Sequence, residues 1–404
     1  MRIAFVGGFA FSPKGTMRAR AHPLASQLVS RGHEVTMFLP PYDNVSDFGR
    51  EWVQDGVRIL NMAGSRFTIR KNGSSAAAWC EFPRLLWQLI GKVNRYHPDL
   101  IHIFKPKGFA GAAGTYFLKK GMRSLVVDCD DWEGWGGWNE VKSYPWLIKE
   151  YIDRQERWIM KSAPALTVAS RFLQHRAERI RTPSDSIYYV PNGARSRVCD
   201  CKQIPSRADL RHKWGFSDRV NILYSGHFSA DEDVFLFSRA VLKAADKSPL
   251  GVVFIGEGAA LPAVKQLFSS KRHVDARFFP QLDYEDFLEV VQAADIAAFP
   301  FRDNRVYRAK CSARIVDYMS MGKAVLTSDV GQNREYIVDG ESGLLAKPED
   351  EEEFVHKLAL LVSNHELRRR LGAAASARID KHFRWDGEPL QNCLAAYDSV
   401  LQKT

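Results

Sequence analysis

Five cationic side chains gather in residues 302–314, between a buried apolar run and a predicted helix. The run that starts at Asp295 predicts a strand, and the amphipathic stretch 315–321, stopped by Gly322, predicts a helix. In an open parallel sheet, anionic ligands bind where a strand ends and the next helix begins. Fixed guanidinium and ammonium groups there would stabilise the charge on a departing phosphate. The five residues are Arg302, Arg305, Arg308, Lys310 and Arg314.

Asp317 lies one helical turn after Arg314, on the same face of that predicted helix. Its carboxylate could accept hydrogen bonds from ligand hydroxyls. The alternative is a surface salt bridge between Asp317 and Arg314, with no ligand involved.

A second group of chemically capable side chains occupies residues 128–138, directly after a predicted strand. Acids alternate there with glycines and tryptophans, which suits a mobile loop whose Trp132 ring stacks on a sugar. Two other interpretations remain. Asp128-x-Asp130 could bind a divalent metal, or the tryptophans could simply pack a domain edge.

Lysines and glycines follow other predicted strands. Lys105 and Lys107 could attract an anionic acceptor, although both could equally be solvated. The backbone amides of the loop from Gly8 through Lys14 to Gly15 could meet a phosphate, but the loop lacks the G-x-G-x-x-G spacing of dinucleotide sites. The Gly256-Glu-Gly258 turn could approach a nucleotide, or could need glycine only for its own geometry.

The elements that must position these residues alternate between strands and helices. In the first half, strands are expected at 2–6, 34–39, 100–104 and 124–127, and helices at 17–31 and 79–96. Further strands are expected from Val220, around 252–255, at Phe278 and from Asp295, and residues 194–218 are expected to form a polar linker. This βα rhythm predicts parallel, doubly wound sheets.

Composition narrows the class of protein. A chain of 404 residues suits two or three domains, and no apolar run approaches the ~18 residues of a spanning helix. Residues 1–200 carry a net charge of +11 and the rest of the chain carries −1, which gives the total of +10. The basic first half indicates an anionic partner or merely a solvated basic surface. The basic residues are scattered and form no nucleic-acid motif, so nucleic acid is not expected. The weak Cys199-x-Cys201 pair favours free thiols and a cytoplasmic location.

The segment 315–343 resembles the nucleotide-sugar signature of family-four glycosyltransferases with the GT-B fold. The first half resembles the same family at Gly32-His-Glu-Val35 and at 97–103, and residues 188–193 resemble the motif that closes its first domain. The resemblance implies two Rossmann-like domains that face each other across a cleft. The acceptor-binding domain comprises residues 1–195 and a C-terminal helix, residues 385–404, that packs back on it. The nucleotide-sugar-binding domain comprises residues 215–384. It implies retaining, metal-independent transfer from a nucleotide sugar without a cofactor.

The resemblance also implies roles for individual residues. Catalytic roles fall to Asp130, Arg308 and Lys310. Acceptor contacts fall to Lys105, Lys107, Asp128, Asp131 and Trp132. Donor contacts fall to Gly8, Gly15, Gly226, His227, Gly256, Gly258, Leu282, Arg314 and Asp317.

Two departures from the family keep other functions open. Ala309 stands where the E-x7-E pair needs an acid, and His227 stands where an arginine is expected. A non-catalytic sugar-nucleotide-binding homologue and a GT-B epimerase or hydrolase are therefore the alternatives to a transferase. For a transferase, the open acceptor classes are a glycan and a lipid-linked sugar, the latter with peripheral docking at the inner face of an anionic membrane.

Overall fold

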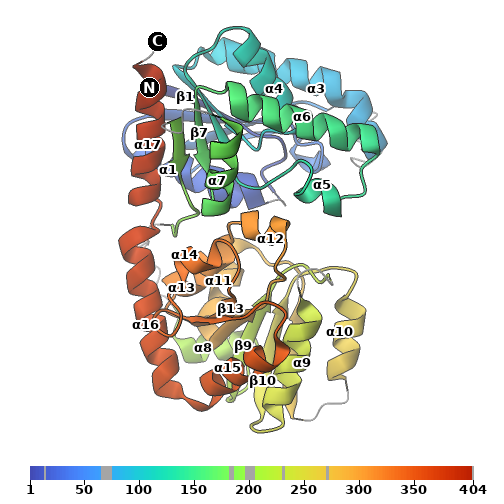
Figure 1. Cartoon of the computed structure of the whole chain (residues 1–404), viewed down its shortest axis with the longest axis vertical. Helices are drawn as coiled ribbons and strands as arrows, with labels where there is room; N and C mark the ends of the chain where they lie inside the picture. Colours follow the sequence, from blue (N-terminus) through green and yellow to red (C-terminus); the bar gives the residue numbers. More distant parts are fainter. Residues whose placement is uncertain are drawn as a thin grey trace. The chain divides into compact units, whose positions relative to one another are not determined.

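The computed structural model describes residues 1–12, 15–64, 75–181, 186–195, 205–229, 233–269 and 273–402, without the side chains of residues 75–80. The chain forms two compact units (Figure 1). The first comprises residues 1–195, 309–311 and 385–404, and the second comprises residues 196–308 and 312–384. Each unit contains its own parallel-sheet α/β body, which confirms the predicted fold class. Lys14, Cys199 and Cys201 lie outside the described residues.

The first unit holds a sheet with the strand order β3-β4-β2-β1-β5-β6-β7-β8. Its neighbouring strands pair in parallel, except that β3 runs antiparallel to β4. The central strands β5 and β6 are buried along their whole length because helices cover both faces of the sheet. The strands are β1 (Arg2–Val6), β2 (Glu34–Leu39), β3 (Glu51–Gln54), β4 (Val57–Asn61), β5 (Leu100–Phe104), β6 (Leu125–Cys129), β7 (Ala165–Val168) and β8 (Ile187–Tyr189).

The hairpin formed by β3 and β4 is not among the predicted elements. Asp55 and Gly56 connect the two strands with φ angles of 48° and 75°. A two-residue turn with two positive φ angles suits a hairpin because its twist matches that of the strands. The sheet therefore ends in an antiparallel edge strand beyond the predicted parallel strands.

Helices cover the first sheet on both faces. Residues of α1 and α17 form one hydrophobic core with Ile3 and Phe5 of β1, while α3, α4 and α6 lie together on the other side (Figure 1). The predicted helix 17–31 begins as a π-helical segment, Thr16–Ala21, before α1. The helices are α1 (His22–Ser30), α3 (Ser75–Tyr96), α4 (Gly108–Lys119), α5 (Trp138–Val141), α6 (Trp146–Ser162), α7 (Arg171–Ile180) and α17 (Glu388–Leu401).

The second unit holds a fully parallel sheet with the strand order β11-β10-β9-β12-β13-β14. The order reverses at β9, so that β9 and β12 flank the point where ligands of such sheets bind. The strands are β9 (Val220–Ser225), β10 (Leu250–Ile255), β11 (Val274–Phe279), β12 (Ile296–Phe299), β13 (Ala324–Ser328) and β14 (Leu344–Ala346).

Several helices of the second unit begin at a capping side chain or end at a glycine. Asp283 caps α11 and Asp350 caps α15 by accepting from backbone N–H groups, and Gly322 ends α13 with a φ of 67°. The expected linker 194–218 is wrong in part, since it contains α8. The helices are α8 (Arg207–Lys213), α9 (Val234–Ala245), α10 (Leu261–Phe268), α11 (Tyr284–Ala293), α12 (Arg305–Ala309), α13 (Ala313–Ser320), α14 (Asn333–Tyr336), α15 (Glu351–Ser363) and α16 (His365–His382).

Candidate functional site

Three distant segments of the first unit meet at the carboxyl edge of its sheet. Gly8 follows β1, Lys105 follows β5, and Asp130 follows β6. The strand order reverses at β1, so this edge is the expected ligand position. Contacts tie the segments together: the Thr16 hydroxyl donates to Asp130 Oδ2 over 2.8 Å, and Lys105 Nζ lies 3.6 Å from Asp130 Oδ1.

The two lysines of this edge are paired with carboxylates. Lys105 Nζ lies 2.7 Å from Asp131 Oδ2 and 3.1 Å from Glu133 Oε1, and Lys107 pairs with the other oxygen of Glu133. Lys105 is buried and holds a φ of 66°, a backbone conformation that side chains rarely adopt. The expectation that Lys105 and Lys107 attract an anionic acceptor needs correction, because neighbouring carboxylates already neutralise their charges.

The cluster shifts the pKa values of Lys105, Asp131 and Glu133. Burial alone would lower the pKa of Lys105, but Asp130, Asp131 and Glu133 hold it well above its usual value. Burial opposes the charged form of Glu133, yet the ammonium groups of Lys105 and Lys107 lower its pKa to about 2. Burial raises the pKa of Asp131, against the attraction of Lys105. Opposite charges therefore stabilise one another here in a poorly solvated place.

Asp130 and Glu133 each keep one carboxylate oxygen without a hydrogen-bond partner among the described residues, and the more exposed of the two is Asp130. Its side chain is 11% exposed, and Oδ1 has no hydrogen-bond partner among the described residues. A buried carboxylate oxygen in this state can accept a hydrogen bond from a ligand hydroxyl. Thr16 and Glu133 complete the cluster, although the sequence reasoning assigned neither a role, because their partners lie far away in sequence.

The segment 128–138 is anchored, in contrast to the expected mobile loop. The backbone N–H groups of Glu133 and Gly134 donate to the buried carboxylate of Glu156 on α6. The Arg176 guanidinium pairs with Glu156 and also lies 4.7 Å from the ring centroid of Trp132. Because this ring already stacks with a cation, the expected stacking of Trp132 on a sugar is not what the structure shows; the alternative of structural packing fits better.

Asp128 has a structural position. It lies within β6, is buried, and accepts from both Nε and Nη2 of Arg20 and from the Thr167 hydroxyl. His102 links Thr167 to Tyr397 of α17, at 3.3 Å and 2.9 Å. The predicted acceptor contact of Asp128 is therefore corrected to a positioning role, since Arg20 occupies the carboxylate. The sequence carries no signal for this pair, whose members stand 108 positions apart.

In the second unit, the predicted donor residues also share one edge. Gly226, Gly256, Leu282 and Arg302 follow β9, β10, β11 and β12, and His227 is exposed beside them. The glycines allow close packing of the turns, because a Cβ on Gly256 would lie 2.0 Å from the Gly226 carbonyl oxygen. A Cβ on Gly258 would likewise lie 2.4 Å from the carbonyl oxygen of Phe228. The glycine requirement is thus explained by the turns alone.

Gly15 differs from these glycines. It has an ordinary φ of −70°, and a Cβ added there would meet nothing within 4 Å. The backbone at Gly15 therefore does not require glycine, and the residue's predicted ligand role has no support from local geometry.

Arg314 and Asp317 occupy the predicted edge, and each contacts a residue from another element. Arg314 donates to the carbonyl oxygen of Ser225, the last residue of β9. Asp317 Oδ1 accepts a 2.8 Å hydrogen bond from the hydroxyl of Tyr284, at the start of α11. Tyr284 holds the half-buried carboxylate between α11 and α13, and it is a site residue that the sequence analysis missed.

Two of the remaining cations, Arg302 and Arg308, have local carboxylate partners. Arg308 makes a bidentate contact with Asp303, at 2.5 and 2.7 Å, and Arg302 lies 3.1 Å from Asp233. The hydrogen bond from Arg308 lowers the pKa of Asp303. Lys310 lies in the short segment 309–311, which belongs to the first unit. The Ser170 hydroxyl of that unit donates to the carbonyl of Ala309, the residue before Lys310.

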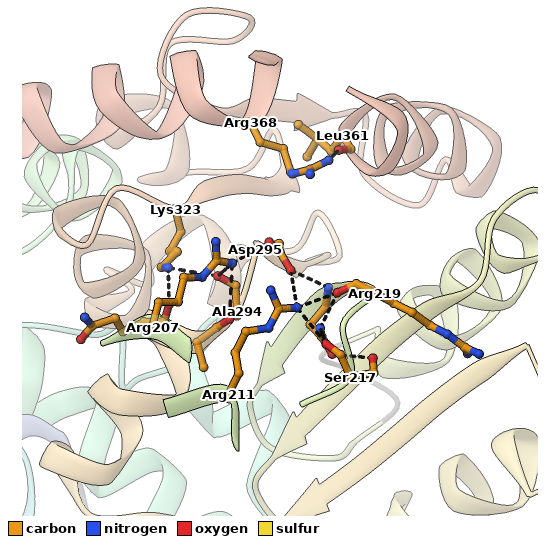
Figure 2. A network of polar contacts seen from close by, with 12 residues as sticks. Arg207, Arg211, Ser217, Arg219, Ala294, Asp295, Lys323, Leu361 and Arg368 are labelled. Carbon is orange, nitrogen blue, oxygen red and sulfur yellow. Dashed lines mark hydrogen bonds and ion pairs between the residues drawn. The ribbon is translucent and has the colours of Figure 1, made fainter. Parts of the chain in front are cut away.

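A strongly perturbed lysine lies at the opposite edge of the second sheet. Lys323 precedes β13 and donates to the carbonyls of Gln292 and Ala294, at the carboxyl end of α11 (Figure 2). Arg207 donates to the same Ala294 carbonyl and pairs with Asp295. Burial, followed by the nearby charge of Arg207, lowers the pKa of Lys323 to about 7. Cations here satisfy the exposed carbonyls at a helix end, which is a structural task.

Comparison with known proteins defines the family. Residues 206–378 match the family described as glycosyl transferases group 1, and residues 15–193 match the glycosyl transferase 4-like domain. The two matches together span most of both units. The chain belongs to the group 1 glycosyltransferases and has the GT-B fold.

Several relatives resemble the chain over most of its length. The α-D-kanosaminyltransferase of Streptomyces kanamyceticus is 21% identical over 328 residues, which are 80% of this chain and 75% of the relative. The solved sucrose-phosphate synthase of Thermosynechococcus elongatus matches all of both chains with a TM-score of 0.77 and 17% identity. HepE of Anabaena, solved in complex with UDP-glucose, matches 98% of both chains with a TM-score of 0.71 and 14% identity. At these identities the structures establish the fold alone.

Proposed function

We propose that this glycosyltransferase transfers a sugar, with retention of anomeric configuration, from a nucleoside diphosphate sugar to an acceptor hydroxyl. The main support is the arrangement of Arg314 and Asp317 at the strand-reversal edge of the second sheet. A cation at the end of β9 suits a diphosphate, and a carboxylate fixed by Tyr284 suits ribose hydroxyls. A uridine nucleotide is the first donor to test, because the HepE neighbour was solved with UDP-glucose.

The acceptor hydroxyl is proposed to bind at Asp130. Its Oδ1, which has no hydrogen-bond partner among the described residues, can accept a hydrogen bond from the incoming hydroxyl before the reaction, and the Thr16 hydroxyl fixes Oδ2. Lys105 places a positive charge 3.6 Å from the Asp130 carboxylate and so helps to hold it in position. Asp130 would orient the attacking oxygen, which is a contribution of position and not of covalent catalysis.

The bond-making step is proposed to occur on the face of the sugar from which the phosphate departs. No Asp or Glu can be named here as a covalent nucleophile. The donor's own phosphate oxygen would therefore take the acceptor proton while the anomeric carbon–oxygen bond breaks. The acceptor oxygen then bonds to the anomeric carbon, and the nucleoside diphosphate leaves with its charge near Arg314.

Donor turnover tests this function against the two alternatives. A thermal-shift screen over nucleotide sugars should first identify the donor as the compound that raises the melting temperature most. A transferase then releases the nucleoside diphosphate only with an acceptor, and proton NMR of the product reports retention. Turnover without an acceptor would indicate an epimerase or hydrolase, and binding with no turnover in any acceptor mixture would indicate a non-catalytic homologue. An inverted anomeric centre would contradict the same-face mechanism.

A further inference from the structure

The first unit exposes an unusual amount of aromatic and aliphatic surface on α6 and α3. Large apolar side chains that face solvent are normally scattered singly. Here one helix, α6, carries four of them. Their exposed fractions are 63% for Trp146, 72% for Leu147, 45% for Tyr151 and 39% for Trp158, and Trp87 of α3 is 63% exposed.

The exposed residues of α6 form one stripe along the helix. Leu147, Tyr151, Arg154, Trp158 and Lys161 follow one another at intervals of three or four residues, so they share a face. The opposite face is fixed in the unit: Ile152, Ile159 and Met160 are buried, while Asp153 and Glu156 hold the backbone of residues 133–135. This mixed apolar and basic stripe is therefore presented to solvent by a helix whose opposite face is packed in the unit.

The stripe continues across α4 toward α3. Helix α4 packs against both α6 and α3 (Figure 1). Lys119 Nζ of α4 lies 5.9 Å from the ring centroid of Trp158, and Tyr116 of α4 lies 6.0 Å from Trp87 between ring centroids. We call this surface, made of residues 116–120 and the exposed residues of 141–161, the α4/α6 face.

The charged residues of the α4/α6 face are predominantly basic. Glu150 is an acid of this face, and it pairs with Arg154 and accepts from the Trp135 indole. Lysines lie over aromatic rings, as at Lys120 over Tyr116 and Lys149 over Trp135. The basic residues are Lys119, Lys120, Lys142, Lys149, Arg154, Arg157 and Lys161, of which Lys149 is half-buried.

We propose that the α4/α6 face docks reversibly on the surface of a bilayer that contains anionic lipid. Tryptophan and tyrosine prefer the level of lipid headgroups, and lysine side chains extend their charges toward phosphates. A protein partner fits less well, since lysine is depleted in the cores of protein–protein interfaces. No helix in the described part of the chain is long and apolar enough to cross a membrane, so the docking is peripheral.

The docking face joins the proposed acceptor side of the same unit. The ring of Tyr144, next to α6, lies 6.0 Å from Lys107 Nζ, and Trp135 of the anchored segment bonds to Glu150 of α6. Docking would therefore place the cluster around Asp130 near the headgroup level. This consequence, delivery of a lipid-borne acceptor, rests on the proposed function, whereas the docking itself does not.

Vesicle co-sedimentation tests the docking. Wild-type protein should bind phosphatidylglycerol-containing vesicles, bind phosphatidylcholine vesicles far less, and lose binding as salt rises from ~50 to ~500 mM. The triple variant Trp146→Ser, Leu147→Ser, Trp158→Ser should bind about tenfold more weakly, and so should Lys149→Glu with Lys161→Glu. The matched controls are Val53→Ser, which removes an apolar side chain 68% exposed on β3, and Lys247→Glu with Lys381→Glu in the second unit. They should bind as wild type does.

Two outcomes would overturn the docking. One is negligible wild-type binding to anionic vesicles. The other is variant binding equal to that of the controls. Self-association in sedimentation velocity that the triple variant abolishes, without vesicle binding, would assign the face to a second copy of the chain instead. Donor-induced thermal shifts without vesicles report on the proposed function separately, because the α4/α6 face lies outside the donor residues.

Discussion

Lys105 and Lys323 are both largely buried lysines at the edge of a parallel sheet, yet their pKa values shift in opposite directions. Lys105 follows β5 at a carboxyl edge and faces Asp130, Asp131 and Glu133, which hold its pKa well above the usual value. Lys323 precedes β13 at an amino edge, where burial and Arg207 lower its pKa to about 7. Burial acts in the same direction on both lysines, so the neighbouring charges decide the outcome.

The two lysines differ in what lies around them. At the carboxyl edge, ligands approach the ends of the strands, and Asp130 beside Lys105 keeps a carboxylate oxygen without a hydrogen-bond partner among the described residues. At the amino edge, helices end, and Lys323 satisfies carbonyls that the helix leaves without partners. A shifted pKa alone would select both lysines. The position in the sheet separates the candidate site from the structural one.

The largest expected effect is the loss of stability caused by substituting Lys105. The substitution Lys105→Met leaves three carboxylates without their shared counter-charge and should lower the free energy of unfolding of the first unit by about 3–5 kcal/mol. Urea unfolding followed by tryptophan fluorescence at pH 7 measures it. The exposed Lys142→Met is the control and should stay within about 0.5 kcal/mol of wild type. A loss below about 1 kcal/mol for Lys105→Met would mean that the cluster is not a mutually stabilising unit.

The next effect concerns donor binding at the second unit. Arg314→Ala should weaken binding of UDP by about 1.5–3 kcal/mol, the range for a hydrogen bond to a charged group. Lys310→Ala should fall in the same range if that ammonium group meets the phosphates. Arg308→Ala should cost less, because its guanidinium already makes a bidentate contact with Asp303. Isothermal titration calorimetry gives the affinities, and normal UDP binding by all three variants would move the phosphate site elsewhere.

A smaller effect is expected from Lys323, on the pH dependence of the free energy of unfolding. The folded-state pKa of Lys323 is about 7 and the usual value is 10.5, so the folded state binds fewer protons than the unfolded state between these values. Stability from this group therefore rises with pH across that window and is lowest below pH 7. The difference in unfolding free energy between wild type and Lys323→Met should grow by about 1 kcal/mol from pH 7 to pH 8. A difference independent of pH would show that Lys323 titrates near its ordinary value.

The smallest expected effect is that of a chelator. Donor turnover should be unchanged in EDTA, because Asp128 is occupied by Arg20 and the Asp128-x-Asp130 pair does not offer two available carboxylates. The assay compares initial rates with and without EDTA. Activity that EDTA removes, that Mg²⁺ or Mn²⁺ restores and that Asp130→Asn abolishes would favour the metal interpretation.

Local patterns in the sequence were sufficient for much of the fold. The buried runs at β1, β2 and β5 lie within their predicted bounds, and Gly322 ends α13 in the left-handed conformation that glycine favours. Such features depend on hydrophobic periodicity and backbone preference over a few neighbouring residues, which a single sequence displays. The hairpin of β3 and β4 was missed because its exposed short strands carry little apolar signal.

The sequence by itself determined the alternation of strands and helices, the family resemblance and the excess of basic residues in the first half. Only the tertiary structure decided which of those charges remain available. Lys105 meets Glu133, and Arg20 meets Asp128, because parallel strands far apart in sequence end side by side. Strand order and register create these pairs, and neither can be deduced from the spacing of residues along the chain. The basic side chains left outside such pairs, on α4 and α6, therefore became recognisable as a surface only after the chain had folded.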